Sequence, residues 1–121
     1  RDGSYFFTQS NANNQDVNVG VIDSGVEPSI SWFSNFICRD PQENDTLNCV
    51  LNDEIGYDFI NDIGDPVDRN NHGTPINGII GANFQNDGLE LINGKFYDGD
   101  YGQLFEAVCA MHYTMDEGVQ V

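Results

Sequence analysis

Two residues of this 121-residue chain, Asp23 and His72, have the types that proton-transfer chemistry needs. A histidine changes its charge near neutral pH, so it can take a proton from a hydroxyl nucleophile and later return it. A carboxylate bonded to the ring orients the imidazole and stabilises the imidazolium that forms. Aspartate–histidine pairs also serve as structural hydrogen bonds and beside metal ligands, so residue type alone leaves these interpretations open.

The segments around both residues predict where they lie. Residues 17–22 are rich in Val and end in a continuous apolar run, which is typical of a strand buried on both faces. Asp23 follows as the start of an Asp-Ser-Gly turn, so we expect it at the carboxyl end of a parallel strand, where ligands and catalytic groups collect. Asn71 is the expected N-cap of a helix over residues 72–82. This places His72 at a helix N-terminus, which disfavours the imidazolium.

The rest of the chain predicts three further elements. Residues 56–60 are expected to form a short strand, and residues 91–97 a strand with a turn or bulge at Asn93-Gly94. Residues 101–117 predict a long helix with His112 as a packing residue at the border of its core-facing stripe, which comprises Leu104, Val108, Met111 and Met115. Residues 119–121 then begin another β-prone segment. This order predicts an α/β fold, a mostly parallel sheet with flanking helices.

The motifs that contain both residues resemble those of the subtilisin-like serine proteases, the subtilase family. Residues 19–26, Val-Gly-Val-Ile-Asp-Ser-Gly-Val, are similar to the family's Asp motif. Residues 71–74, Asn-His-Gly-Thr, and the Gly-Ile-Ile-Gly-Ala at 78–82 are similar to its His motif. The resemblance covers roughly residues 17–121. It implies the N-terminal part of a subtilisin-like catalytic domain, incomplete in this chain, with an arm at residues 1–16 before it and an inserted loop near 27–55.

The resemblance implies that Asp23 is the triad aspartate and His72 the general base of peptide-bond hydrolysis. The family's Gly-Thr-Ser motif and its oxyanion-stabilising Asn come later in the chain, and residues 1–121 hold no counterpart. Four serines precede His72 in the wrong motif and order: Ser24, Ser29, Ser31 and Ser34. We therefore expect a portion of a serine endopeptidase that acts on polypeptides, inactive as an isolated chain. Its expected partner is the remainder of the catalytic domain or a complementing chain.

The alternative is a non-catalytic pseudoprotease or interaction module with the same fold. Two departures from the family pattern keep it open: Pro75 stands where a second His is usual, and Asn77 where a small residue is usual. A proline removes a backbone donor, and an asparagine puts a polar group where close packing is expected. A nucleotide-binding domain is disfavoured, because no Gly-rich loop with a Lys follows the first strand.

The charge of −16, from 20 acidic against 4 basic residues, argues against nucleic acid and anionic membranes as partners. Solubility is one interpretation of this charge, and Ca²⁺ binding is the other. The acidic loop resembles a calcium-binding segment of some subtilases, with a solvated loop as the alternative. Its oxygen donors are Asp58, Asp62, Asp65 and Asp68. No other cofactor is expected.

The cysteines bear on the compartment of the protein. Cys38 and Cys49 lie in a polar stretch rich in turn residues, where a disulfide would indicate an oxidising environment and two free thiols are the alternative. With the family resemblance, this favours a secreted or cell-surface protein. Cys109 is expected on a buried helix face without chemistry. No apolar run reaches the roughly 18 residues of a membrane span.

Overall fold

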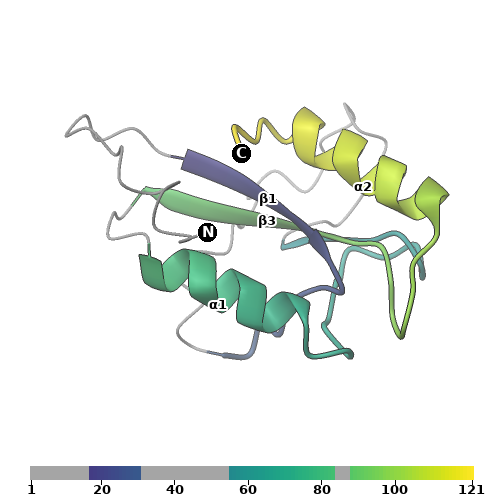
Figure 1. Ribbon diagram of the computed structural model, residues 1–121. Coiled ribbons are helices and arrows are strands. Elements are labelled where there is room, and N and C mark those ends of the chain that lie inside the picture. Colours follow the sequence, from purple (N-terminus) through teal and green to yellow (C-terminus); the bar gives the residue numbers. More distant parts are fainter. Residues whose placement is uncertain (1–16, 31–54, 84–87) are drawn as a thin grey trace, which may run out of the picture.

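A computed structural model describes residues 17–30, 55–83 and 88–121. Its three strands form one parallel sheet in the order β1-β3-β2: β1 is Val17–Asp23, β2 is Gly56–Asp58 and β3 is Leu89–Lys95. Helix α1, Gly73–Asn83, and helix α2, Leu104–Asp116, cover opposite faces of this sheet (Figure 1). The predicted α/β fold with a parallel sheet and flanking helices is confirmed.

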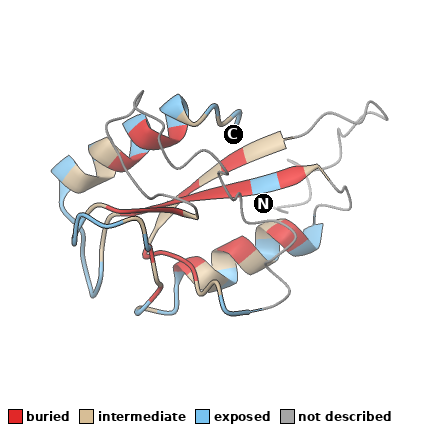
Figure 2. Ribbon diagram, turned by 180° about the vertical axis from the view of Figure 1, so that it is seen from behind, coloured by how far each residue is buried: buried red, intermediate tan, exposed pale blue. Residues whose placement is uncertain are grey.

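Alternation along the strands divides the core between the two faces. On the α1 side, Ile76 and Ile80 pack against four buried strand residues: Val19, Val21, Leu89 and Leu91. On the α2 side, Ile92 clusters with Tyr57 and Tyr113. Figure 2 shows β3 as a nearly continuous buried strand between the helices, and only Glu90 in it is exposed. Because a β-strand directs successive side chains to opposite faces, β3 supplies both halves of the core.

Glycines on two neighbouring strands bring α2 close to the sheet. A Cβ atom on Gly20 would lie 3.0 Å from the Thr114 Cβ, and one on Gly94 would lie 3.0 Å from the Ala110 Cβ. Any larger residue would force the helix outward. The predicted bulge at Asn93-Gly94 is therefore wrong: both residues belong to the regular strand β3, and Gly94 is small because α2 packs on it.

The N-terminus of α1 also differs from its prediction. Asn71 has φ +57°, a left-handed conformation, and the helix begins two residues later at Gly73. The first N–H groups of the helix are satisfied from other parts of the chain, since Gly73 donates to Ser24 Oγ and Thr74 to Asp68 Oδ2. The sequence-local cap expected from Asn71 is replaced by tertiary hydrogen bonds.

The apolar stripe predicted on α2 faces away from the sheet, which overturns the expected orientation of this helix. Leu104 is 80% exposed and Met115 66%, and Val108, Met111 and His112 are exposed as well. The residues that α2 buries are Ala110, Tyr113 and Thr114. Ala110 and Thr114 lie directly over Gly94 and Gly20, where the helix approaches the sheet closely and larger side chains would not fit.

Two boundaries near the sheet are also corrected. Strand β2 ends at Asp58, earlier than expected, because the Asp58 carboxylate accepts hydrogen bonds from the N–H groups of Ile60 and Asn61 and turns the chain. Residues 119–121 run beside β1 without forming a regular strand: Gln120 N–H donates to the Asn18 carbonyl, and Gly20 N–H donates to the Val121 carbonyl.

Candidate active site

Asp23 is the last residue of β1, and the turn after it holds its carboxylate. The Ser24 N–H donates to Asp23 Oδ1 at 2.7 Å. The chain then passes through Gly25 at φ +108°, where a Cβ atom would lie 2.2 Å from the Pro66 carbonyl oxygen. Only glycine fits this combination of positive φ and close backbone approach. The Asp-Ser-Gly sequence is thus explained residue by residue.

The Asp23 turn is joined to the start of α1 through a buried Ser24–Asp68 contact. Ser24 Oγ donates to Asp68 Oδ1 at 2.8 Å and accepts from the Gly73 N–H at 2.9 Å. The Asp68 carboxylate also accepts from three backbone N–H groups, those of Asn70, Asn71 and Thr74. These contacts hold the segment that carries His72 against the end of β1.

This hydrogen bonding lowers the pKa of Asp68. Burial by itself would raise the pKa, but hydrogen bonds from Thr74, Ser24 and Asn70 favour the ionised form and bring it from 3.8 to about 2. Asp68 was predicted as a calcium donor. In the structure Asp68 is buried, and its carboxylate joins two segments 44 residues apart in the chain.

His72 and Asp23 lie within hydrogen-bond distance, although 49 residues separate them in the sequence. His72 Nδ1 is 2.8 Å from Asp23 Oδ1 and 3.0 Å from Oδ2. A carboxylate can only accept here, so the neutral ring carries its proton on Nδ1 and its lone pair on Nε2. The Asp23 side chain is 14% exposed and the His72 side chain 60%. The carboxylate is therefore held in the protein while the ring stays open to solvent.

Tyr97 also contacts Asp23 and was not singled out from the sequence. Its hydroxyl donates to Asp23 Oδ1 at 3.1 Å, and its ring lies 6.4 Å from the His72 ring between centroids. Burial raises the pKa of Tyr97, and the Asp23 charge and hydrogen bond raise it further. The register of the sheet could have identified Tyr97. Asp23 pairs with Lys95 across β1 and β3, and residue 97 follows just beyond the end of β3.

Pro75 and Asn77, the two departures from the family motif, lie in different surroundings. Pro75 is exposed in the first turn of α1, where its missing N–H is best tolerated. Asn77 is fully buried and pairs with buried Asn93 of β3 through two amide hydrogen bonds of 2.9 and 3.1 Å. Asn77 Nδ2 also donates to the Gly73 carbonyl. The polar group at position 77 is thus matched by a second polar group across the helix–sheet contact.

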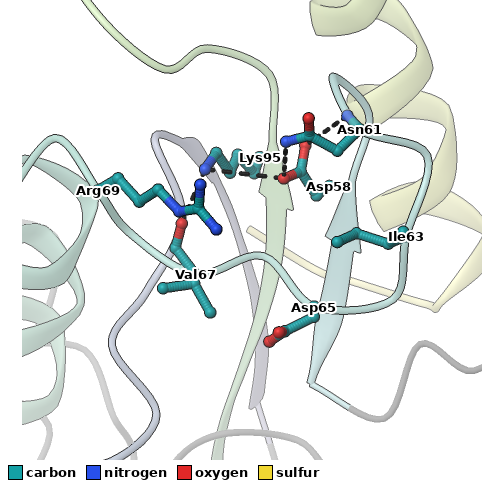
Figure 3. Close-up of a pocket in the computed structure, with 7 residues that line it drawn as sticks. All are labelled: Asp58, Asn61, Ile63, Asp65, Val67, Arg69 and Lys95. Atoms are coloured by element: carbon teal, nitrogen blue, oxygen red, sulfur yellow. Dashed lines mark hydrogen bonds and ion pairs between the residues drawn. The ribbon is translucent and has the colours of Figure 1, made fainter.

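The acidic loop borders a pocket of about 220 Å³ (Figure 3). Asp58 lies in its wall and contacts Asn61 Nδ2 at 2.8 Å and the Lys95 ammonium at 3.7 Å. Lys95 is 1% exposed and donates to the Val67 carbonyl and to Asp98. In Figure 3 the carboxylates of Asp58 and Asp65 lie apart within this wall.

The four predicted calcium donors are not brought together. Asp62 accepts a hydrogen bond from the Tyr57 hydroxyl at 2.6 Å, while Asp58 and Asp68 have the separate partners described above. Within residues 17–30, 55–83 and 88–121, no three His, Cys, Asp or Glu side chains converge as metal ligands would. Calcium binding stays a prediction, without a shared carboxylate cage to support it.

Cys38 and Cys49 lie outside the described residues, as do the arm at 1–16 and most of the predicted insertion. Cys109 is a free thiol, half-buried on α2. In the described part of the chain, no helix has the length and apolarity that crossing a membrane requires.

Comparison with known proteins agrees with this geometry. The chain is 37% identical over 90 residues to subtilisin-like protease 1 of Plasmodium vivax, which covers 68% of this chain and 14% of that protein. The proteins of the same name from Plasmodium falciparum (isolate 3D7) and Plasmodium berghei (strain Anka) are 35% and 33% identical over 69 residues, or 51% of this chain. These matches span 10% and 12% of the two relatives. The sequence model of the subtilase family matches residues 14–103, which include Asp23 and His72, and the chain belongs to the subtilase family.

Proposed function

We propose that this chain supplies the acid–base half of a serine endopeptidase site. The contact between Asp23 and His72 Nδ1, 2.8 Å long at the carboxyl end of β1, carries the proposal. Family membership supports it, since the relatives are named as subtilisin-like proteases. The matched relatives are much longer than this chain, so the activity proposed is that of a whole protein in which this segment takes part.

The chemistry follows from the positions of the two ring nitrogens. With Nδ1–H directed at Asp23, His72 Nε2 is the basic nitrogen and takes the proton from a serine hydroxyl as that oxygen attacks the peptide carbonyl. The imidazolium then faces a carboxylate at 2.8 Å, which stabilises the positive charge. His72 returns the proton to the leaving amine. Residues 1–121 contribute the base and its orienting carboxylate, and the nucleophile comes from other sequence.

The exposed face of α2 supports a partner that completes the domain. Five large apolar side chains lie on it in contact with solvent: Leu104, Phe105, Val108, Met111 and Met115. Apolar patches of this kind mark interaction surfaces. We propose that the remainder of the catalytic domain, or a complementing chain, covers this face. The alternative is a pseudoprotease, which would keep the contact between Asp23 and His72 and lack the nucleophilic serine.

Peptidase activity tests the proposal directly. A fluorescent casein substrate is incubated with the 121-residue chain and with the protein extended through its next Gly-Thr-Ser segment. We expect hydrolysis only by the extended protein, blocked by a serine-directed covalent inhibitor. Replacing His72 by Ala should lower kcat by at least about 10³-fold, while Asn83→Ala, at an exposed residue of α1, leaves it unchanged. An extended protein that folds and does not cleave would favour the pseudoprotease.

We also propose a secreted or cell-surface location, which rests on the family and on the cysteine pair. Mass-spectrometric mapping after alkylation without reductant should find Cys38 joined to Cys49. Full alkylation of both thiols in the native protein would contradict an oxidising compartment.

A further inference from the structure

Tyr97 is poised to influence the Asp23–His72 pair through the carboxylate they share. Asp23 Oδ1 has three donors around it: the Ser24 N–H at 2.7 Å, His72 Nδ1 at 2.8 Å and the Tyr97 hydroxyl at 3.1 Å. Ser24 approaches from the backbone of the same turn. Tyr97 approaches from beyond β3, so the carboxylate is held between two strands.

The packing around Tyr97 makes its hydroxyl position well defined. The Phe96 and Tyr97 rings meet edge to face at 4.9 Å between centroids, and the Tyr97 ring is tilted against His72. The Phe96 N–H donates to the Asp23 carbonyl, which ties the segment to β1. Backbone and ring contacts therefore place the phenol oxygen beside Asp23.

We propose that Tyr97 is a positioning residue of the Asp23–His72 pair: its hydroxyl holds the Asp23 carboxylate and tempers the basicity of His72. This rests on the proposed serine-peptidase site. A donor on a carboxylate takes up part of its charge, which leaves less charge to stabilise the imidazolium. A phenol whose pKa is raised, as here by burial first and Asp23 second, stays protonated and keeps donating.

The other ionisable groups near the pair come from several segments. Helix α1 carries none, since its sequence is Gly-Thr-Pro-Ile-Asn-Gly-Ile-Ile-Gly-Ala-Asn. Charged groups on the segments that neighbour the pair include Glu27, Asp68, Arg69, Lys95 and Asp98. Of these, Lys95 is bound to Asp98 and Val67, and Asp68 faces Ser24 and the start of α1. Among the described residues, Tyr97 is the donor besides His72 that reaches the Asp23 carboxylate from outside its own turn.

The test replaces Tyr97 by Phe, which keeps the ring and removes the hydroxyl. The His72 Cε1–H resonance is followed by NMR against pH in the intact protein that contains this chain, assigned with His72→Gln. We expect the midpoint of the His72 titration to move to higher pH by roughly 0.5 pH units. His112 serves as an internal control, and Tyr101→Phe, at an 86% exposed tyrosine, should move neither histidine.

A second substitution tests the same contact in the opposite direction. Incorporating 3-fluorotyrosine at position 97 keeps the packing and makes the hydroxyl a stronger donor, so the His72 midpoint should fall. An unchanged His72 midpoint in both variants, or an equal movement of His112, overturns the proposal. Because this readout needs no hydrolysis, an inactive protein would count against the proposed function while leaving the Tyr97 coupling measurable.

Discussion

At the scale of single residues, the site depends on carboxylates whose partners are mainly N–H and O–H groups. Asp23 orients a histidine, whereas Asp68 joins the turn after β1 to the first turn of α1. Both are aspartates in a chain with 20 acidic residues, and composition does not separate them. Their surroundings do, because Asp68 is nearly fully buried and Asp23 faces an open ring.

Asp68 should make the stability of the protein depend on acid pH. Its folded pKa, about 2, lies below the unfolded value near 3.8, so the stabilisation is complete above about pH 4 and is lost as pH falls toward 2. This contribution amounts to about 2 kcal/mol. Urea unfolding at pH 4.5 and pH 2.5 measures this contribution. The free energy of unfolding should fall between the two pH values by more in the wild type than in Asp68→Asn. An equal fall in both proteins would assign the acid sensitivity to other carboxylates.

At the scale of elements, the contact between α1 and β3 is specified by a polar pair inside an apolar layer. Asn77 and Asn93 are both fully buried and exchange two amide hydrogen bonds. In the sequence, each asparagine is a polar residue where an apolar or small one is expected: Asn77 in a helix that packs on the sheet, and Asn93 in a buried strand. Together they satisfy each other and set the register between the helix and the strand.

Removing one member of this pair should cost more than removing both. Asn77→Ala leaves the Asn93 amide buried without its partner and should destabilise the protein by about 3 kcal/mol. Adding Asn93→Ala removes the amide that was left without a partner. The double variant should therefore lose less stability than the sum of the two single variants, with a coupling of about 1–2 kcal/mol. Urea unfolding measures all four proteins. Asn83→Ala, an exposed asparagine on the same helix, should change stability by less than about 0.5 kcal/mol. Additive losses would mean that the pair is not coupled.

At the scale of the whole molecule, the two faces of the sheet are covered differently. Helix α1 packs the half-buried Ile76 and Ile80 against the core, whereas α2 contacts the sheet with Ala110, Tyr113 and Thr114 and exposes five large apolar side chains. The second helix therefore has one face against the sheet and one apolar face exposed to solvent.

The outward face of α2 should promote association without stabilising the fold of this segment. Changing Leu104, Met111 and Met115 together to Gln should lower self-association in sedimentation velocity runs, with unfolding free energy changed by less than about 1 kcal/mol. His112→Gln, an exposed polar substitution on the same helix, is the control. A loss of several kcal/mol in the triple variant would show that these side chains pack within the segment.

The sequence by itself predicted the order of the main strands and helices and the positions of Asp23 and His72 at their ends. Apolar runs, the Asp-Ser-Gly turn and the His-Gly-Thr start of α1 are local patterns, and strand and helix formation respond to local periodicity. Those patterns predicted Asp23 at a strand end and His72 beside a helix start, which the structure places 2.8 Å apart.

Only the tertiary structure decided which groups meet across the chain. Tyr97 on Asp23, Ser24 on Asp68 and Asn77 on Asn93 each join segments separated by at least 16 residues, and no local periodicity encodes such pairs. The orientation of α2 has the same origin, because glycines on β1 and β3 leave room only for small residues at positions 114 and 110, and the helix's apolar stripe then faces away from the sheet. Packing depends on the shapes of both partners, whereas a sequence pattern describes one of them.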